Sequence, residues 1–592
     1  MISQLSWKVG GQQGEGIEST GEIFSMAMNR MGYHLYSYRH FSSRIKGGHT
    51  NNKIRVSTKP MRAISDDLDI LVAFDQETID FNAHELREGG IIIADAKFNP
   101  KLPDGLQTVR FLTVPLTEIA DELGTSLMKN MVSIGASSAI LGIPVESYRE
   151  IVEDMFLRKG EKVVEKNMEA IRRGFEYVTE QTGGQLPEFQ LEKAEPQKQL
   201  FMIGNDAIAL GAIAAGCRFM PAYPITPASE IMEYLIKKLP KFGGTVIQTE
   251  DEIAAITMAI GANFAGARAM TASAGPGLSL MMEAIGLAGI TETPVVIVDT
   301  QRGGPSTGMP TKIEQSDVNA MIYGTHGDVP KVVIAPSSVE ECFYDTVEAF
   351  NIAEEYQLPV IVMTDLTLSL GKQTVKPFDY SKVEIRRGKL LAGQELPERE
   401  QNDLFKRYEV TEDGVSPRVI PGQKYGLHHV TGVEHAQTGR PSEDAANRVQ
   451  QMEKRMRKLK GVLANFKNPV VADAPHADAD VLVIGINSTI GTIQEAKGRL
   501  EQEGLKVNHA QLRLLHPFPA DEVKALMETA KQVVVVEHNI QAQVANLIKQ
   551  NVGYAEKIQS VLKYDGNPFL PKEIYAQVKE LTKHGNYERV SQ

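Results

Sequence analysis

The sequence predicts an α/β protein with three α/β domains and an extended connector. Short apolar strands alternate with helical patterns over most of the chain, which is typical of α/β folds. Two polar, proline-containing stretches interrupt this alternation. A length of 592 residues also fits several domains at ~150 residues each. The predicted parts are residues 1–183, a linker at 184–199, residues 200–376, a connector at 377–472 and residues 473–592.

The first part predicts a parallel sheet. A short strand at 6–9 leads into a glycine-rich loop and a helical pattern that runs to Met31. Apolar strands follow at 69–74 and 91–94, with a helical pattern at 76–87 between them. Strand, helix and strand in this order are expected of parallel α/β units.

The glycine-rich loop contains Gly11, Gly14 and Gly16 in the order Gly-Gly-x-x-Gly-x-Gly. Glycines between a strand and a helix let backbone N–H groups approach an anion at the positive helix end. The order differs from the dinucleotide Gly-x-Gly-x-x-Gly, so NAD is not expected. Together with the basic loop of Arg44 and Lys46, it is a candidate for a phosphate-bearing ligand such as coenzyme A. A tight turn without ligand and a solvated surface loop remain the alternatives.

The second part is rich in Ala and Gly and again predicts α/β structure. Its helical patterns lie at 207–215, 228–238, 251–262 and 277–288, and its strands at 295–298, 332–334 and 360–364.

A stiff loop, Tyr-Pro-Ile-Thr-Pro at 223–227, precedes the second of these helices. Pro224 and Pro227 are costly in regular structure and fix a turn at a helix start. The loop presents the Thr226 hydroxyl and a few amides, which suits capture of a small anion. A purely structural turn is the alternative.

Two charged positions stand near helix and strand ends. Glu250 and Glu252 precede an apolar helix, where acidic residues commonly stabilise the helix dipole. Arg302 follows an apolar strand, at the strand end where ligands of α/β proteins bind. Its guanidinium can hold a carboxylate through two hydrogen bonds, although a surface arginine in a turn is the alternative.

The remaining parts differ in character. Residues 377–472 carry scattered charge and prolines, with one charged helix near 444–460, and predict a connector that wraps over its neighbours or is disordered in part. The last part predicts a compact α/β unit with strands 481–484 and 533–537 and helices 489–503, 520–529 and 541–549.

Composition excludes several functional classes. Lys and Arg number 63 and Asp and Glu 75, a net charge of −12, which argues against nucleic-acid binding. Only two cysteines, Cys217 and Cys342, are present, too few for a disulfide framework or an iron–sulfur cluster in this chain. No apolar run reaches the ~20 residues of a membrane span, and no signal-peptide pattern is seen. We therefore expect a soluble, cytoplasmic protein without a metal site of its own.

Four motifs in order resemble the 2-oxoacid:ferredoxin oxidoreductases, which are thiamine-dependent enzymes. They are Tyr-Pro-Ile-Thr-Pro at 223–227, Glu-Asp-Glu-Ile-Ala-Ala at 250–255, Thr-Ala-Ser-Ala-Gly-Pro-Gly at 271–277 and Asp-Thr-Gln-Arg-Gly-Gly-Pro-Ser-Thr-Gly at 299–308. The second part resembles their pyrimidine-binding domain, and the first part their γ domain, which is Rossmann-like. The last part is similar to the transketolase C-terminal domain, so the resemblance is to a γ–α fusion.

This resemblance implies roles for particular residues. Thr226, Pro227 and Arg302 would bind the carboxylate of a 2-oxoacid. Glu252 would contact the aminopyrimidine ring of thiamine diphosphate, with Glu250 as its competitor. The reaction implied is reversible, coenzyme A-dependent oxidative decarboxylation, with electrons passing to ferredoxin.

The resemblance also implies a partner. No Gly-Asp-Gly signature for the diphosphate and Mg²⁺ occurs in the sequence. A β subunit would supply that site and a [4Fe–4S] cluster, in an assembly of two γα and two β chains.

The substrate is left open between 2-oxoglutarate, which we favour, and pyruvate or a branched-chain 2-oxoacid. The distal carboxylate of 2-oxoglutarate needs a second cation, for which Lys312 and Lys46 are weak candidates. Another thiamine enzyme, such as a transketolase or a 2-oxoacid dehydrogenase component, would not explain the first part. A non-catalytic scaffold subunit is the alternative of a different class.

Overall fold

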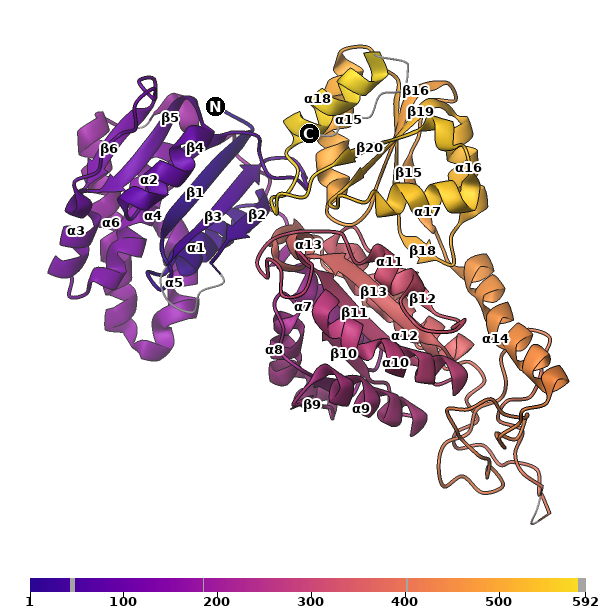
Figure 1. Cartoon of the computed structure of the whole chain (residues 1–592). Helices are drawn as coiled ribbons and strands as arrows, with labels where there is room; N and C mark the ends of the chain where they lie inside the picture. The colour runs from indigo at the N-terminus through magenta and orange to yellow at the C-terminus, as the bar shows by residue number, and fades with distance from the viewer. Residues whose placement is uncertain (43–47, 185, 401–402, 584–592) are drawn as a thin grey trace. The chain divides into compact units, whose positions relative to one another are not determined.

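The computed structural model describes residues 1–42, 48–184, 186–400 and 403–583 (Figure 1). The described chain divides into two compact units. The first unit comprises Met1–Met202, Leu370–Pro377 and Leu570–Lys572, and the second comprises Ile203–Ser369, Phe378–Phe569 and residues 573–583. Both are built from helices and strands, so the predicted α/β class is confirmed. Among the described helices, none combines the length and apolar composition of a membrane span.

The first unit is organised around one eight-stranded sheet, in the order β6-β5-β4-β1-β3-β2-β14-β7. The strands are β1 (Gln4–Gln12), β2 (His34–His40), β3 (His49–Ser57), β4 (Leu68–Ala73), β5 (Leu86–Asp95), β6 (Arg110–Val114), β7 (Leu200–Met202) and β14 (Gln373–Val375). β1, β4, β5 and β6 are parallel, as expected, but β3 runs antiparallel to both β1 and β2. The sheet is therefore mixed rather than parallel throughout.

The helices described in this unit are α1 (Ile17–Arg30), α2 (Gln76–Asn82), α3 (Leu116–Glu122), α4 (Lys129–Leu141), α5 (Arg149–Phe156) and α6 (Glu161–Thr182). α1, α2 and α4 pack on the sheet, and α6 packs on α4. In the core, Trp7 stacks on Phe24 of α1 with ring centroids 4.5 Å apart. The Trp7 indole N–H donates to Ser137 Oγ of α4 at 3.0 Å. Small residues let α4 and α6 approach closely, because a Cβ on Gly135 would lie 1.9 Å from the Ile171 carbonyl oxygen.

The helix predicted at 76–87 is shorter than expected. Asp75 caps it by accepting from the Thr78 N–H at 2.8 Å, and α2 ends at Asn82. A single 3₁₀ turn (Ala83–Glu85) follows, and β5 then begins at Leu86, paired with Leu68 of β4. Strand pairing at this point overrides the local helical pattern.

The second unit contains a five-stranded sheet, in the order β10-β11-β13-β12-β18, and a small parallel pair of β8 (Phe219–Ala222) and β9 (Thr245–Gln248). The strands of the larger sheet are β10 (Met270–Ser273), β11 (Val295–Gln301), β12 (Val332–Ile334), β13 (Pro359–Asp365) and β18 (Leu514–His516). Its first four strands are parallel. The associated helices are α7 (Gly204–Ala214), α8 (Ser229–Lys238), α9 (Glu252–Phe264), α10 (Gly275–Ile290), α11 (Val318–Tyr323), α12 (Val339–Tyr356) and α13 (Leu366–Leu370).

The C-terminal part of the second unit forms its own sheet, in the order β15-β17-β16-β19-β20. The strands are β15 (Val470–Asp473), β16 (Ala479–Gly485), β17 (Val507–Leu512), β19 (Ala530–Glu537) and β20 (Ile558–Leu562). The helices are α15 (Thr489–Gln502), α16 (Ala520–Glu528), α17 (Gln543–Val552) and α18 (Pro571–Lys583). β18 leaves this part to pair antiparallel with β12, so the two sheets are linked by strand pairing.

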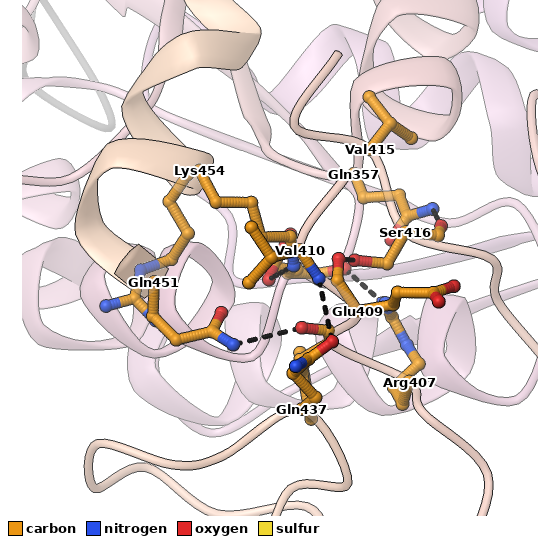
Figure 2. A network of polar contacts seen from close by, with 12 residues as sticks. Gln357, Arg407, Glu409, Val410, Val415, Ser416, Gln437, Gln451 and Lys454 are labelled. Atoms are coloured by element: carbon orange, nitrogen blue, oxygen red, sulfur yellow. Dashed lines mark hydrogen bonds and ion pairs between the residues drawn. The ribbon is translucent and has the colours of Figure 1, made fainter. Parts of the chain in front are cut away.

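The described part of the connector is irregular, apart from a short 3₁₀ turn (Tyr380–Lys382) and α14 (Ala445–Asn465), but it is held by hydrogen bonds (Figure 2). The Gln451 side chain of α14 donates to the Tyr408 carbonyl at 3.0 Å. The Val410 N–H donates to Gln437 Oε1 at 3.1 Å, and the side chain of Gln357, which follows the last residue of α12, donates to the Ser416 carbonyl at 2.6 Å. The first two bonds hold the connector together internally, and the bond from buried Gln357 fastens it to the rest of the unit.

A buried ion cluster adds to this attachment. Lys454 Nζ of α14 lies 2.6 Å from Glu292 Oε1, Lys458 pairs with the other Glu292 oxygen, and all three side chains are fully buried. Arg407 donates to the Glu292 carbonyl at 2.7 Å. Burial alone would raise the pKa of Glu292, but the two lysines lower it well below its usual range. Burial lowers the pKa of Lys458 to about 7, against the attraction of Glu292.

This cluster makes Glu292 more important for stability than an exposed acid. In Glu292→Gln, Lys454 and Lys458 stay buried without a counter-charge, so we expect the free energy of unfolding to fall by about 3–5 kcal/mol. Denaturant unfolding followed by circular dichroism measures this. Glu503→Gln, at an exposed pair with Lys579, is the matched control and should change little. Equal stability of Glu292→Gln and the control would contradict the anchoring role.

Candidate active site

The Tyr-Pro-Ile-Thr-Pro loop connects β8 to α8, as its prolines predict. Its Thr226–Pro227 peptide bond is cis, and the Ala228 N–H closes the turn by donating to the Ile225 carbonyl at 2.8 Å. Buried Asn205 of α7 donates to the Pro227 carbonyl at 2.7 Å. Pro227 is buried and Thr226 is half-buried. The bond from Asn205 therefore fixes the loop at its buried end, while Thr226 stays near the surface.

Arg302 follows the last residue of β11 and contacts this loop. Its Nη1 donates to the Thr226 carbonyl at 2.6 Å and its Nη2 to the Thr307 carbonyl at 3.2 Å. The side chain is buried, and its Nε is enclosed without an acceptor among the described residues. Burial lowers the Arg302 pKa, while the nearby Asp317 carboxyl opposes this. The structure therefore brings Thr226 and Arg302 together through a main-chain contact.

Glu252 is the first residue of α9. Asp251 caps this helix by accepting from the Ala254 N–H at 2.8 Å. Glu252 is only 7% exposed, whereas Glu250, its competitor, is exposed. The Glu252 side chain passes over Gly277 in the first turn of α10: a Cβ on Gly277 would lie 2.7 Å from Glu252 Oε1.

Several polar groups near these residues were not singled out from the sequence. Ser273 ends β10 and pairs in register with Asp299 of β11, and Asp317 lies just before α11. The Ser273 hydroxyl, both Asp299 carboxyl oxygens and Asp317 Oδ2 are buried and lack hydrogen-bond partners among the described residues. In the sequence, Ser273 and Asp299 could have been recognised as polar residues at the end of an apolar strand.

The site therefore has a consistent position in the fold. Ser273 and Arg302 mark the carboxyl ends of the adjacent parallel strands β10 and β11, where α/β proteins bind ligands. Glu252 and Gly277 lie in the first turns of α9 and α10, whose positive ends favour negative charge. Acid, guanidinium and helix ends are thus gathered at one edge of the sheet.

Comparisons with known proteins match three ranges of the chain to family models. Residues 210–455 match the family described as "Pyruvate flavodoxin/ferredoxin oxidoreductase, thiamine diP-bdg". Residues 6–177 match "Pyruvate ferredoxin/flavodoxin oxidoreductase", and residues 479–574 match "Pyruvate:ferredoxin oxidoreductase core domain II".

Individual relatives cover nearly the whole chain. The chain is 34% identical to 2-oxoacid:ferredoxin oxidoreductase 2, subunit alpha, of Aeropyrum pernix, over 99% of both chains. It is 37% identical to the 2-oxoglutarate synthase subunit KorA of Methanothermobacter thermautotrophicus, over 65% of this chain and 100% of that protein. A solved 2-oxoglutarate:ferredoxin oxidoreductase from Magnetococcus marinus, with 2-oxoglutarate, coenzyme A and succinyl-CoA bound, is 37% identical with a TM-score of 0.91, over 98% of this chain and 100% of that chain.

The chain belongs to the 2-oxoacid:ferredoxin oxidoreductases. It is an alpha subunit of this family, and the resemblance drawn from its motifs is confirmed. The thiamine diphosphate-binding family match covers residues 210–455, which include most of the second part and much of the connector.

The glycine-rich loop of this alpha subunit holds an internal carboxylate. Glu15 Oε2 accepts from the Gln12 N–H at 3.0 Å, and Glu15 Oε1 lies 2.7 Å from Lys129 Nζ. Gly14 and Gly16 have φ of 102° and 79°, which favour glycine. Glu15 thus accepts from the Gln12 N–H, a backbone donor that an anion bound at this loop would otherwise use. Arg44 and Lys46, the other candidates for a phosphate, lie outside the described residues.

Gly277 gives a direct test of the close packing around Glu252. In Gly277→Ala, the new Cβ would lie 2.0 Å from Ser273 Oγ and 2.7 Å from Glu252 Oε1, so both side chains must move. We expect a loss of stability of about 1–3 kcal/mol and a strong fall in activity of the assembled enzyme. Gly286→Ala on the same helix meets open space and should keep both. Equal behaviour of the two variants would contradict this packing.

Proposed function

We propose that this alpha subunit binds the carboxylate of 2-oxoglutarate and activates thiamine diphosphate in a coenzyme A-dependent 2-oxoglutarate:ferredoxin oxidoreductase that works reversibly. The observation that carries the proposal is the buried Arg302 guanidinium held against the Thr226 loop, at the same sheet edge as the buried Glu252. The named relatives that act on 2-oxoglutarate, each 37% identical to this chain, support the choice of substrate. Pyruvate or a branched-chain 2-oxoacid is the alternative.

Arg302 has the donors that carboxylate binding requires. A guanidinium carries five N–H groups, and carbonyls of Thr226 and Thr307 take one hydrogen bond from each terminal nitrogen. These bonds fix the plane of the guanidinium group. They leave N–H donors that could bind a carboxylate through two parallel hydrogen bonds. The acceptors are neutral carbonyls, so the positive charge remains available to the substrate. The Thr226 hydroxyl would add one hydrogen bond.

The residues around Glu252 fit the aminopyrimidine of thiamine diphosphate. Glu252 is buried, and beside it lie the small Gly277 and the buried Ser273 hydroxyl, which has no hydrogen-bond partner in the part of the chain that the structure describes. Thiamine diphosphate, when bound, supplies the electron sink for decarboxylation of the 2-oxoacid. Glu252 would hold a proton shared with a pyrimidine ring nitrogen, and the burial of its side chain would keep water from that proton.

A partner subunit completes the proposed enzyme. The sequence lacks a Gly-Asp-Gly signature, and Cys217 and Cys342 are both buried in this chain. We propose that a β subunit contributes the diphosphate and Mg²⁺ site and a [4Fe–4S] cluster that passes electrons to ferredoxin, in a (γα)₂β₂ assembly. Large apolar side chains at the surface of α9 and α10, namely Ile253, Met258 and Leu280, support such a contact.

Replacement of Arg302 tests the carboxylate site. In Arg302→Ala we expect kcat/KM for 2-oxoglutarate to fall by an amount worth about 1.5–3 kcal/mol, because charge-assisted hydrogen bonds are lost. Dye-linked turnover of the reconstituted complex measures this. Arg302→Lys keeps the charge without the fork and should recover part of the loss. An unchanged KM and kcat/KM in Arg302→Ala would contradict a role of Arg302 in binding the substrate carboxylate.

Replacement of Glu252 separates an enzyme subunit from a scaffold. Glu252→Gln removes the acid but keeps the shape, so we expect assembly with the β subunit and a loss of activity of about 100-fold or more. Glu250→Gln, at the exposed neighbour, is the matched control and should remain active. Full activity of Glu252→Gln in an intact complex would favour a non-catalytic scaffold.

A further inference from the structure

The segment that follows β11 returns to the strand from which it starts. Arg302 comes directly after β11, and the Asp317 N–H donates to Oε1 of Gln301, the last residue of that strand, at 3.1 Å. Residues 302–316 therefore form a closed loop, which we call the Arg302 loop. Its tip at 305–309 is exposed. Compact loops with neighbouring ends are frequently functional.

Hydrogen bonds within the Arg302 loop join its start to its end. The Thr307 carbonyl accepts from Arg302 Nη2 at 3.2 Å. Glu314 Oε2 accepts from the Gly304 N–H at 3.3 Å and from the Ser316 hydroxyl at 2.8 Å. The end of the loop is thus tied to the residues that follow Arg302, and a shift of one end is felt at the other.

Gln315 fixes the end of this loop from all sides. Its Nε2 donates to Asp365 Oδ2 of β13 at 2.9 Å and to the Ile486 carbonyl at 3.3 Å. Its Oε1 accepts from the His538 N–H at 3.0 Å, and its own N–H donates to the His538 carbonyl at 2.7 Å. The Asn539 side chain donates to the Gln315 carbonyl at 3.0 Å. Every polar group of this fully buried residue is therefore paired, and its side-chain amide serves as both donor and acceptor.

Most of these partners belong to the C-terminal part of the second unit. Ile486 follows β16 and His538 follows β19, so both stand at the carboxyl ends of strands of the C-terminal sheet. A further contact from this edge reaches the start of the Arg302 loop, because Gln301 Nε2 donates to Asn487 Oδ1 at 3.4 Å. The C-terminal part therefore holds the Arg302 loop at both of its ends, with Gln315 as the main contact.

We infer that Gln315 is a positioning residue for the Arg302 carboxylate site, and that the C-terminal part of the second unit contributes to substrate binding through it. The inference rests on the proposed role of Arg302. Two carbonyls direct the guanidinium, and one of them, that of Thr307, lies in the loop that Gln315 holds. Release of the loop would let Thr307 move and the guanidinium with it. A carboxylate bound through two parallel hydrogen bonds needs both donors in place, so such movement weakens its binding.

Gln315→Glu keeps the shape of the side chain and removes its donor. A carboxylate there would face Asp365 Oδ2 and the Ile486 carbonyl, which are both acceptors in the structure. Gln315→Met keeps the length without a buried charge and replaces Gln315→Glu if that variant does not fold. Gln357→Glu is the matched control. Gln357 is also fully buried, and its amide donates to the Ser416 carbonyl at 2.6 Å, so the same donor is lost at the connector instead of the Arg302 loop.

The first measurement does not depend on activity. Hydrogen–deuterium exchange of the full chain, followed by mass spectrometry, reports how firmly residues 302–317 are held. We expect the amides of this segment to exchange roughly tenfold faster or more in Gln315→Glu and Gln315→Met, because the loop opens more readily. In Gln357→Glu the segment should exchange as in the wild type. Unchanged exchange in both Gln315 variants would overturn the anchoring.

The second measurement links the anchoring to the substrate. In the reconstituted complex, we expect KM for the 2-oxoacid to rise roughly tenfold in the Gln315 variants, with kcat changed by less than about threefold. A merely structural role would lower the amount of active enzyme, and therefore the apparent kcat, without changing KM. Gln357→Glu should accordingly keep the wild-type KM even where its stability falls.

Each outcome decides one part. Faster exchange with an unchanged KM in both Gln315 variants would overturn the link between the loop and the carboxylate site. An equal rise of KM in Gln357→Glu would also overturn it, because the effect would then not depend on the Arg302 loop. Lack of any 2-oxoacid turnover by the wild-type complex would instead overturn the proposed function, and the exchange results would still decide on the anchoring.

Discussion

The candidate site depends on keeping a buried guanidinium positively charged. A buried ion is costly unless hydrogen bonds compensate for lost water. Arg302 obtains them from the main-chain carbonyls of Thr226 and Thr307, which carry no charge. The same bonds clamp the loop after β8 to the end of β11. One interaction therefore fixes the position of Arg302 and leaves its charge without a carboxylate partner among the described residues, as the proposed role in substrate binding requires.

The rest of the second unit holds this arrangement in place with other buried charges. Arg268 pairs with Glu354 at 2.9 Å, and Arg418 pairs with the other Glu354 oxygen at 2.9 Å, so the connector is tied to α12. In the same way, Glu292 ties α14 to the segment before β11 by its pair with Lys454. Such ion pairs contribute little to the stability of the protein compared with apolar packing. Loss of one partner, however, leaves an unpaired buried charge and strongly destabilises the protein. They specify where the irregular connector lies rather than how strongly it folds.

Much of the fold could be predicted because its strands are apolar and its helices periodic. The second part shows this: α8, α9, β11, β12 and β13 lie close to the predicted ranges. β3 was missed because His49, Asn51, Lys53 and Arg55 are polar although buried, and β17 was missed for the same reason. Pairing of β14 with β2 and β7 joins segments far apart in the sequence, for which no local pattern exists.

The site was predictable in part for a related reason. Prolines around Thr226 and the strand before Arg302 mark a turn and a strand end, which local sequence reveals. That Arg302 contacts the Thr226 main chain, and that Asp299 is fully buried, depends on tertiary packing alone. The family assignment is confirmed by comparison, whereas the individual residue roles remain proposals.

The most direct test of the central claim is a panel of 2-oxoacids assayed with coenzyme A and a viologen acceptor, using the chain alone and the chain reconstituted with the proposed β subunit. The account predicts coenzyme A-dependent viologen reduction with 2-oxoglutarate as the preferred substrate, by the complex and not by the chain alone. Turnover by the chain alone, or a complex that reduces viologen with none of the 2-oxoacids, would contradict it.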